Sequence, residues 1–163
     1  MRYMIHEHAL GLGQQADIID ENGEPVLRVD GKLLALHERV HLRDAGSGEV
    51  VAEVARKLAA LRPTFEIAVA GQPPAELTQH LLALLGERFT ITQPPREQLE
   101  IDGDLLSHEF TVRRGEETVA TVSKRWFSVG ATYGVDVAPG GDDLLILASV
   151  LALDLANLGK QSW

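Results

Sequence analysis

The chain has 163 residues, of which 45% are hydrophobic and 24% are charged, and its formal net charge is −9. This length and composition predict a single globular domain over residues 1–163, while the acidic balance argues against nucleic acid as a partner, because binding to phosphates requires a basic face. The absence of cysteine excludes disulfides, thiolate zinc sites and a cysteine nucleophile.

A four-residue phrase of leucine and alanine recurs along the first half of the chain. It follows His8 in degenerate form and then follows Lys32, Lys57 and His80, at steps of 23 to 25 residues. A repeat of this period indicates one small supersecondary unit used several times. The units also contain glycine-rich turns between alternating apolar residues, which are typical of β-hairpins. We therefore expect repeated hairpins, with the apolar residues of the phrase packed in the core.

A longer repeat links two larger blocks of the strand region, which we place at about residues 1–139. Four residues recur as identical residues 68 positions later: Val51, Ala52, Val54 and Thr64. Residues 29–34 also resemble residues 101–106 at an offset of 72. A constant offset over several identities indicates that the hairpin pattern is repeated across the strand region.

The segment 75–88 supports two interpretations. It follows Pro73 and Pro74 and is rich in helix formers, which favours a helix. In the repeat, however, residues 75–77 copy residues 52–54, which favours a strand. Because the register of a repeat is a longer-range constraint than local propensity, we predict strand here, with a helix as the alternative.

The last segment predicts a helix over residues 142–158. Asp142 and Asp143 supply an N-cap and negative charge at its start, and Gly159 is expected to end it. Large aliphatic residues are spread around most of its circumference, which is typical of a buried helix around which a sheet closes. The apolar run at 144–153 is shorter than the roughly 20 residues that cross a membrane. Since the N-terminus also lacks a secretory signal, we expect a cytoplasmic protein with no transmembrane segment.

Seven stretches share a pattern with one known family: residues 1–3, 30–36, 57–63, 101–104, 122–128, 133–135 and 142–148. The run from 122 to 136 is the most specific. Over nearly its full length the chain resembles the LURP-one-related family, within the superfamily of Tubby C-terminal-like domains and phospholipid scramblases. The resemblance implies a mainly β (α+β) fold, a closed antiparallel barrel of twelve strands that encloses a hydrophobic C-terminal helix. This agrees with the hairpins and the buried helix inferred from the residues.

The superfamily includes phosphoinositide-binding Tubby domains and calcium-linked scramblases, so the resemblance implies anionic lipid headgroups or a phosphorylated ligand as the binding partner. Candidate binding residues are the basic residues that open repeat copies and the cations near them: Lys32, Arg56, Lys57, Lys124 and Arg125. The alternative for these positions is a solvated charge that blunts pairing at strand ends.

The sequence predicts no catalytic residue, no metal site and no cofactor. His6 and His8 could share a strand face, as could His37 and His41, but no carboxylate lies at a recognised ligand spacing. A barrel filled by a helix also leaves no room for a substrate. We therefore expect a non-enzymatic binding or scaffold module, peripheral to the membrane, that binds anionic phospholipid or a phosphorylated ligand. The alternative is a cytoplasmic protein–protein interaction module with no lipid binding.

Overall fold

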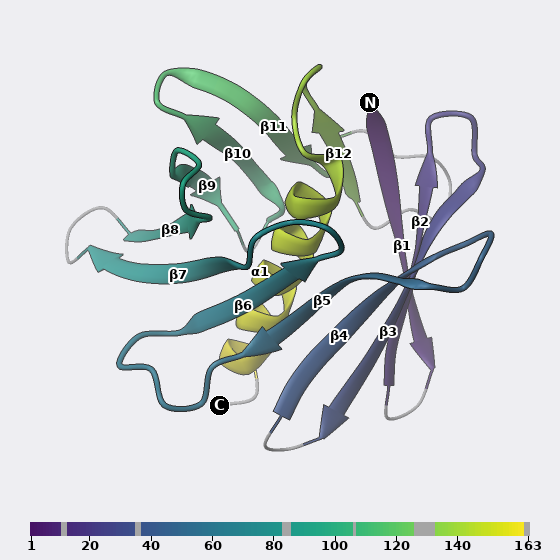
Figure 1. The fold of residues 1–163 in the computed structure, drawn as a ribbon, viewed down its shortest axis with the longest axis horizontal. Coiled ribbons are helices and arrows are strands. Elements are labelled where there is room, and N and C mark those ends of the chain that lie inside the picture. The colour runs from purple at the N-terminus through teal and green to yellow at the C-terminus, as the bar shows by residue number, and fades with distance from the viewer. Residues whose placement is uncertain (11–12, 35–36, 83–85, 106, 126–132, 162–163) are drawn as a thin grey trace.

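The structure is a computed structural model that describes residues 1–10, 13–34, 37–82, 86–105, 107–125 and 133–161. These residues form twelve strands and one helix: β1 (Arg2–Leu10), β2 (Gly13–Asp20), β3 (Pro25–Leu34), β4 (His37–Asp44), β5 (Val50–Arg56), β6 (Thr64–Val69), β7 (Ala75–Leu82), β8 (Gly86–Thr92), β9 (Leu99–Asp104), β10 (Glu109–Arg114), β11 (Glu117–Ser123), β12 (Tyr133–Val137) and α1 (Asp143–Gln161). The strands form a closed barrel that surrounds α1 (Figure 1). The expected twelve-stranded barrel is confirmed.

Each strand pairs antiparallel with the next strand in the chain, and β1 pairs with β12 to close the barrel. All odd-numbered strands therefore run in one direction and all even-numbered strands run in the other. We call the end of the barrel at which α1 begins the proximal end, and the end toward which α1 runs the distal end. Odd-numbered strands end at the distal end, where the β5–β6 loop also lies (Figure 1).

The barrel wall follows the alternation of apolar and polar residues that the sequence predicts. In β6, for example, Phe65, Ile67 and Val69 are buried, whereas Glu66 and Ala68 between them are exposed. Successive side chains of a strand point to opposite faces of the sheet, so the buried set faces the lumen. The buried residues of the other strands join these in one continuous core shared with α1.

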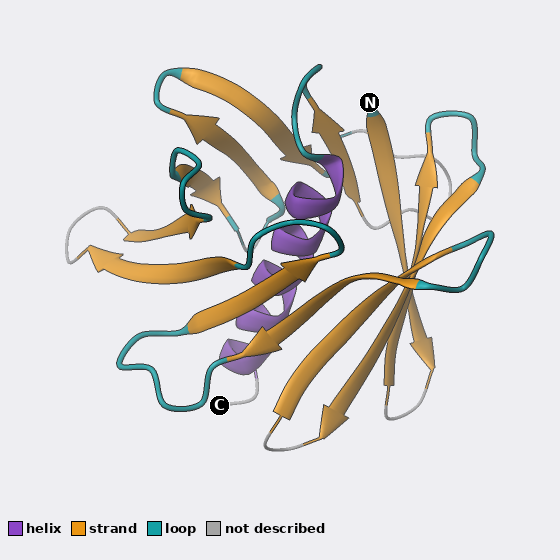
Figure 2. Ribbon diagram, viewed as in Figure 1, coloured by secondary structure: helices purple, strands orange, loops and turns teal. Residues whose placement is uncertain are grey.

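Helix α1 fills the interior of the barrel (Figure 2). Every residue from Leu145 to Leu153 is at most 6% exposed, and a buried run longer than two helical turns covers every face of the helix. Asp142 caps its start, because its Oδ1 accepts a hydrogen bond from the Leu145 amide at 3.1 Å. Ser149 satisfies its buried hydroxyl by donating to the Leu145 carbonyl at 2.7 Å. No described helix combines the length and hydropathy needed to cross a bilayer.

Two local predictions can be compared with the described residues. The strand interpretation of 75–88 is confirmed where the structure describes the chain, because β7 and the start of β8 occupy this segment, and 83–85 lie outside the described residues. The expected end of the helix at Gly159 is wrong, because α1 continues to Gln161. A glycine within a helix costs only about 1 kcal/mol, which the long buried stretch before it easily offsets.

The leucine–alanine phrase does not have the single role that its repetition suggests. In the copy that follows Lys57, Leu58 is 62% exposed and Leu61 is 104% exposed, so the prediction of core packing is wrong for both. They lie in the β5–β6 loop, where the chain has left the sheet and no longer has an inner face. The side chains of the copies at 9–12, 33–36 and 81–84 lie outside the described part of the structure.

Candidate functional site

The predicted basic residues lie on strands that end at the same end of the barrel. Lys32 is near the end of β3, Arg56 ends β5, and Lys57 follows it. Lys124 and Arg125 directly follow β11. Because these three strands are odd-numbered, all five residues belong to the distal half of the molecule. The barrel order places β5 and β11 on opposite walls, so the five residues form two separated groups and not one cluster.

Lys57 is already neutralised by acidic neighbours. Its ammonium donates a hydrogen bond to Glu76 and lies 3.6 Å from Glu66. The hydrogen bond to Glu76 is the main cause that raises the pKa of Lys57 above its ordinary value, although partial desolvation of the ammonium opposes the effect. Next to it, the Arg56 guanidinium lies 5.9 Å from the centre of the Phe65 ring, a cation–π contact. Lys57 is therefore a weaker candidate for binding an anion than the sequence suggests.

Lys124 and Arg125 are held in a fixed turn through their backbone. The Glu109 carboxylate accepts hydrogen bonds from the Ser123 hydroxyl at 2.9 Å and from the Lys124 amide at 3.0 Å. The Ser123 hydroxyl oxygen in turn accepts from the Arg125 amide at 3.1 Å. Within the described residues, neither cationic side chain forms an ion pair, and Arg125 is exposed. Their charges are thus the most available of the predicted set, while the Lys32 side chain lies outside the described part.

Sequence reasoning missed the β5–β6 loop, residues 57–63, which we call the leucine loop. Its base is fixed because the Lys57 amide donates to the Thr64 carbonyl at 2.9 Å and the Gln79 amide donates to the Pro63 carbonyl at 2.9 Å. Its tip presents Leu58 and Leu61 to solvent at the distal end. The absence of apolar–polar alternation before Pro63 is the sequence signal that could have identified a loop.

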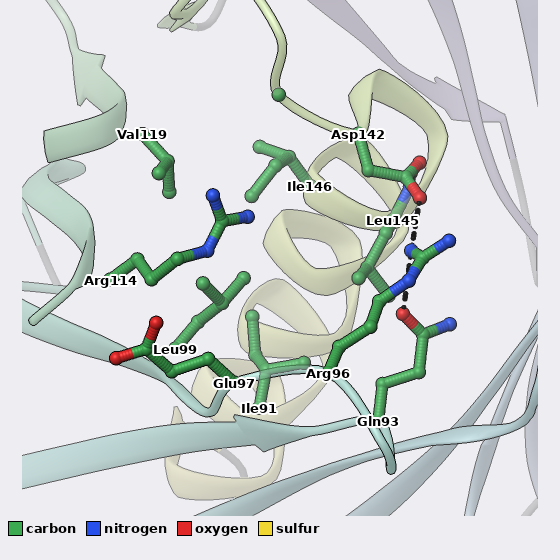
Figure 3. Close-up of a pocket in the computed structure, with 11 residues that line it drawn as sticks. Ile91, Gln93, Arg96, Glu97, Leu99, Arg114, Val119, Asp142, Leu145 and Ile146 are labelled. Atoms are coloured by element: carbon green, nitrogen blue, oxygen red, sulfur yellow. Dashed lines mark hydrogen bonds and ion pairs between the residues drawn. The ribbon is translucent and has the colours of Figure 1, made fainter. Parts of the chain in front are cut away.

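A pocket lies at the opposite, proximal end, between α1 and the strands β8 to β11 (Figure 3). Its inner part has a volume of about 30 Å³, and its apolar walls are Ile91, Leu99, Val119, Leu145 and Ile146. It adjoins an open hollow of about 570 Å³ that shares Arg96, Arg114 and Asp142 with it. We call the inner part and the hollow together the proximal pocket. No sequence motif indicated it, because its residues come from four strands, from α1 and from the loops that precede β9 and α1.

Arg96 is fixed at the mouth of the proximal pocket. Its Nη1 lies 3.0 Å from Asp142 Oδ2, 2.9 Å from Gln93 Oε1 and 3.2 Å from Gln72 Oε1 (Figure 3 shows the first two). The buried Gln93 amide is itself held, because its Nε2 donates to the Pro73 carbonyl at 2.8 Å. Arg114 extends from β10 on the other side of the pocket, and its nearest acidic partner, Glu117, is 4.0 Å away.

A polar cluster joins α1 to the barrel wall at the distal end. His108 Nε2 lies 2.9 Å from Asp154 Oδ1, the Tyr133 hydroxyl donates to the other Asp154 oxygen, and the two rings stack with centroids 4.3 Å apart. His108 has a φ of 52°, a left-handed conformation that costs energy for a residue with a side chain. Among the described residues, His108 Nδ1 is buried without a hydrogen-bond partner. His108 and Asp154 are arranged like an acid–base pair. The clearest effect of the cluster is to fix the later part of α1 to the barrel wall.

The histidine pairs do not gather into a metal site within the described residues. His41 is engaged by Glu53, with Nε2 2.9 Å from Oε2, and the side chains of His8 and His37 lie outside the described part. No group of three or more histidine, aspartate or glutamate side chains with metal-binding geometry occurs in the part of the chain that the structure describes.

Comparisons with known proteins agree with this architecture. The chain is 30% identical to the Bacillus subtilis (strain 168) protein described as uncharacterized protein YxjI, over 85% of this chain and 82% of the relative. The X-ray structure of an Arabidopsis thaliana protein has a TM-score of 0.66 with this structure at 19% identity, covering 96% of this chain and 91% of the other, which shows a shared fold. The wider kinship with Tubby domains and scramblases stays a prediction. The LURP-one-related family pattern matches residues 1–154, and the chain belongs to that family.

Proposed function

We propose that this protein is a non-catalytic binding module that attaches peripherally to anionic membrane surfaces through the distal end of its barrel. The observation that carries the proposal is the position of the leucine loop. Two exposed leucines project from the same end of the barrel to which the topology brings Lys124 and Arg125. Interfacial membrane binding combines inserted apolar side chains with cations that attract anionic headgroups, and this end offers both.

The occupied lumen supports binding at an end of the barrel and not within it. Helix α1 is buried on every face between Leu145 and Leu153, so the interior that other barrels use for a ligand is filled by side chains. A partner must therefore meet the outside or one end of the molecule. This favours a binding role over catalysis on an enclosed substrate.

The small size of the apolar exposure favours a membrane over a protein partner. Among the described residues, the exposed large hydrophobics are Met1, Val50, Leu58 and Leu61, and only the two leucines share a loop. A stable protein interface needs roughly 800 Å² of buried surface on each partner, much more than one loop tip supplies. A bilayer can accept a loop tip, provided that nearby cations add electrostatic attraction.

The net charge of −9 opposes this attraction over long distances. At physiological salt, however, charges are screened beyond about 8 Å, so the groups near the docking end dominate. There the leucine loop contains Arg62, whose Nη1 lies 2.9 Å from His80 Nδ1, and Lys124 and Arg125 lie at the same end of the barrel. We therefore expect weak and salt-dependent attachment.

Co-sedimentation with vesicles tests the proposal. The full chain should sediment with phosphatidylcholine vesicles that contain phosphatidylserine, and should remain in solution with phosphatidylcholine alone. Lys124→Gln/Arg125→Gln removes two cations, each worth about 1 kcal/mol near an anionic surface, so binding should fall roughly thirtyfold. Leu58→Ser/Leu61→Ser should also weaken it, because the inserted apolar area is lost.

Matched controls exist in the proximal half. Arg28→Gln/Arg113→Gln removes the same charge from that half, and Val50→Ser removes an exposed apolar residue, so both should bind like the unmodified chain. Soluble inositol phosphate as a competitor separates a headgroup-only site from a membrane surface. The membrane proposal fails if the unmodified chain does not bind the anionic vesicles. It also fails if the controls weaken binding as much as the distal variants.

A further inference from the structure

We infer that the proximal pocket is a binding site for a small organic carboxylate with a short apolar group. This site lies at the end of the barrel opposite the leucine loop and does not depend on the membrane proposal. It combines two guanidinium groups at its mouth with an apolar recess that leads toward the core (Figure 3).

The two arginines at the mouth leave several guanidinium donors available to a ligand. Both oxygens of Asp142 are engaged, Oδ1 by the Leu145 amide and Oδ2 by Arg96. The hydrogen bonds of Arg96 all use Nη1, so within the described residues its Nε and Nη2 donors have no partner. Arg114 has only the long contact with Glu117. A ligand that accepts hydrogen bonds from these unused donors needs a planar oxyanion, because arginine binds such a group through two parallel hydrogen bonds.

The charge at the mouth disfavours an anion with more than one charge. Around the inner part, Arg96 and Arg114 are balanced by Glu97 and Asp142, and the hollow adds the acidic group of Asp143. The carboxylate of Glu97 lies on the opposite side of the pocket from Asp142 (Figure 3). A dianion such as phosphate would bring excess negative charge close to these two acids, whereas a carboxylate adds one charge.

The recess determines what accompanies the carboxylate. Its volume of about 30 Å³ is close to the space of one water molecule or a methyl group, and its walls are aliphatic. A water there would find few polar partners, whereas a methyl or ethyl group would bury apolar surface. The structure therefore assigns short-chain carboxylates to this site, with propionate as the simplest probe.

Titration of the full chain with propionate, followed by chemical-shift changes in NMR spectra, tests the assignment. We expect saturable shifts at residues of the proximal pocket. Arg114→Gln should weaken propionate binding at least about tenfold, because it removes a charged two-point contact. Arg113→Gln is the matched control, since the neighbouring guanidinium donates to the Gly115 carbonyl and does not line the pocket. Thermal unfolding of both variants checks that they remain folded.

Two further probes separate the contributions of charge and apolar volume. 1-Propanol has the apolar group without the carboxylate, and inorganic phosphate has the charge without the apolar group, so both should bind more weakly than propionate. Val119→Ile should narrow the recess without changing any charge. It should therefore weaken the binding of propionate more than the binding of formate. Unchanged propionate affinity in Arg114→Gln, tighter binding of phosphate, or no saturable binding of propionate would each overturn the assignment.

Discussion

The hydroxyl of Tyr133 donates a hydrogen bond to the carboxylate of Asp154, and this contact joins the first residue of β12 to the later part of α1. His108 contacts the other oxygen of the same carboxylate and stacks on the Tyr133 ring. The Asp154 and His108 side chains are only 15% and 17% exposed. This partly exposed carboxylate is therefore satisfied by two groups from the wall of the barrel.

Tyr133→Phe removes the hydroxyl from this contact and leaves the ring in place. We expect the free energy of unfolding to fall by about 1.5–3 kcal/mol, the range for a hydrogen bond to a charged group. Denaturant unfolding followed by circular dichroism measures the change. A loss below about 0.5 kcal/mol, within the ordinary range of surface substitutions, would show that the carboxylate finds equivalent solvation without the tyrosine.

Leu151→Ala tests whether α1 is the core of the barrel. Leu151 is 6% exposed within the lumen, so the truncation should cost about 2–5 kcal/mol of unfolding free energy. Leu61→Ala is the matched control from the exposed copy of the leucine phrase and should change stability by less than about 0.5 kcal/mol. Equal costs for the two variants would contradict the placement of one or both leucines.

Gly103 is required where two strands approach closely. Its φ is 136°, and a Cβ there would lie 2.5 Å from the Glu109 carbonyl oxygen and 2.6 Å from Phe110 Cα, both backbone atoms that cannot move independently. Gly103→Ala should therefore destabilise the fold by about 3 kcal/mol or more. Gly48→Ala, also at positive φ but in open space, should cost only about 1 kcal/mol. Thermal and denaturant unfolding of the two variants gives the comparison.

Stability should decline in alkaline solution because of Tyr3. Burial raises the pKa of its phenol, and the hydrogen bond to Asp143 adds to the effect. Above pH about 10 the unfolded chain releases the phenol proton while the folded chain retains it, so this contribution is complete below that pH and is lost as pH rises. Unfolding free energies measured across this range should fall less steeply in Tyr3→Phe. Parallel curves for the two proteins would contradict the raised pKa.

Lys57 and Lys124 should differ in their importance for vesicle binding. Glu76 and Glu66 neutralise Lys57, whereas Lys124 forms no ion pair within the described residues. Lys57→Gln should thus reduce binding to anionic vesicles less than Lys124→Gln does. Added salt should weaken vesicle binding by both variants. The reverse order in a sedimentation assay would place the docking surface on the β5 side of the barrel alone.

The barrel could be predicted because its strands carry their own signals. Alternation such as Phe65, Ile67 and Val69, with turns between hairpins, identifies strands, and the buried run after Asp142 identifies the helix. The repeat register correctly favoured strand over helix for β7, where local composition was misleading. The alternation within a strand and the register of a repeat are both patterns along the sequence, so they can be read without knowing which distant residues meet.

The candidate sites could be predicted only in part, because they depend on contacts between distant residues. Nothing near Lys57 in the sequence reveals that Glu76 neutralises it. Leu58 and Leu61 have the same composition as a core segment, and only the departure of the chain from the sheet exposes them. The proximal pocket brings Arg96 to Asp142, 46 positions apart, which no spacing rule anticipates.

The position of α1 in the chain has a consequence for synthesis on the ribosome. All twelve strands precede the helix that fills the space between them, and β12, which closes the barrel against β1, comes just before it. Until β12 is made, the edges of β1 and β11 are unpaired, and until α1 is made, the inner faces of the strands have no helix to cover them. Such uncovered apolar surface and open edges are where nascent chains aggregate. The last step of barrel folding therefore follows the synthesis of α1, and a chaperone would protect the chain most just before that step.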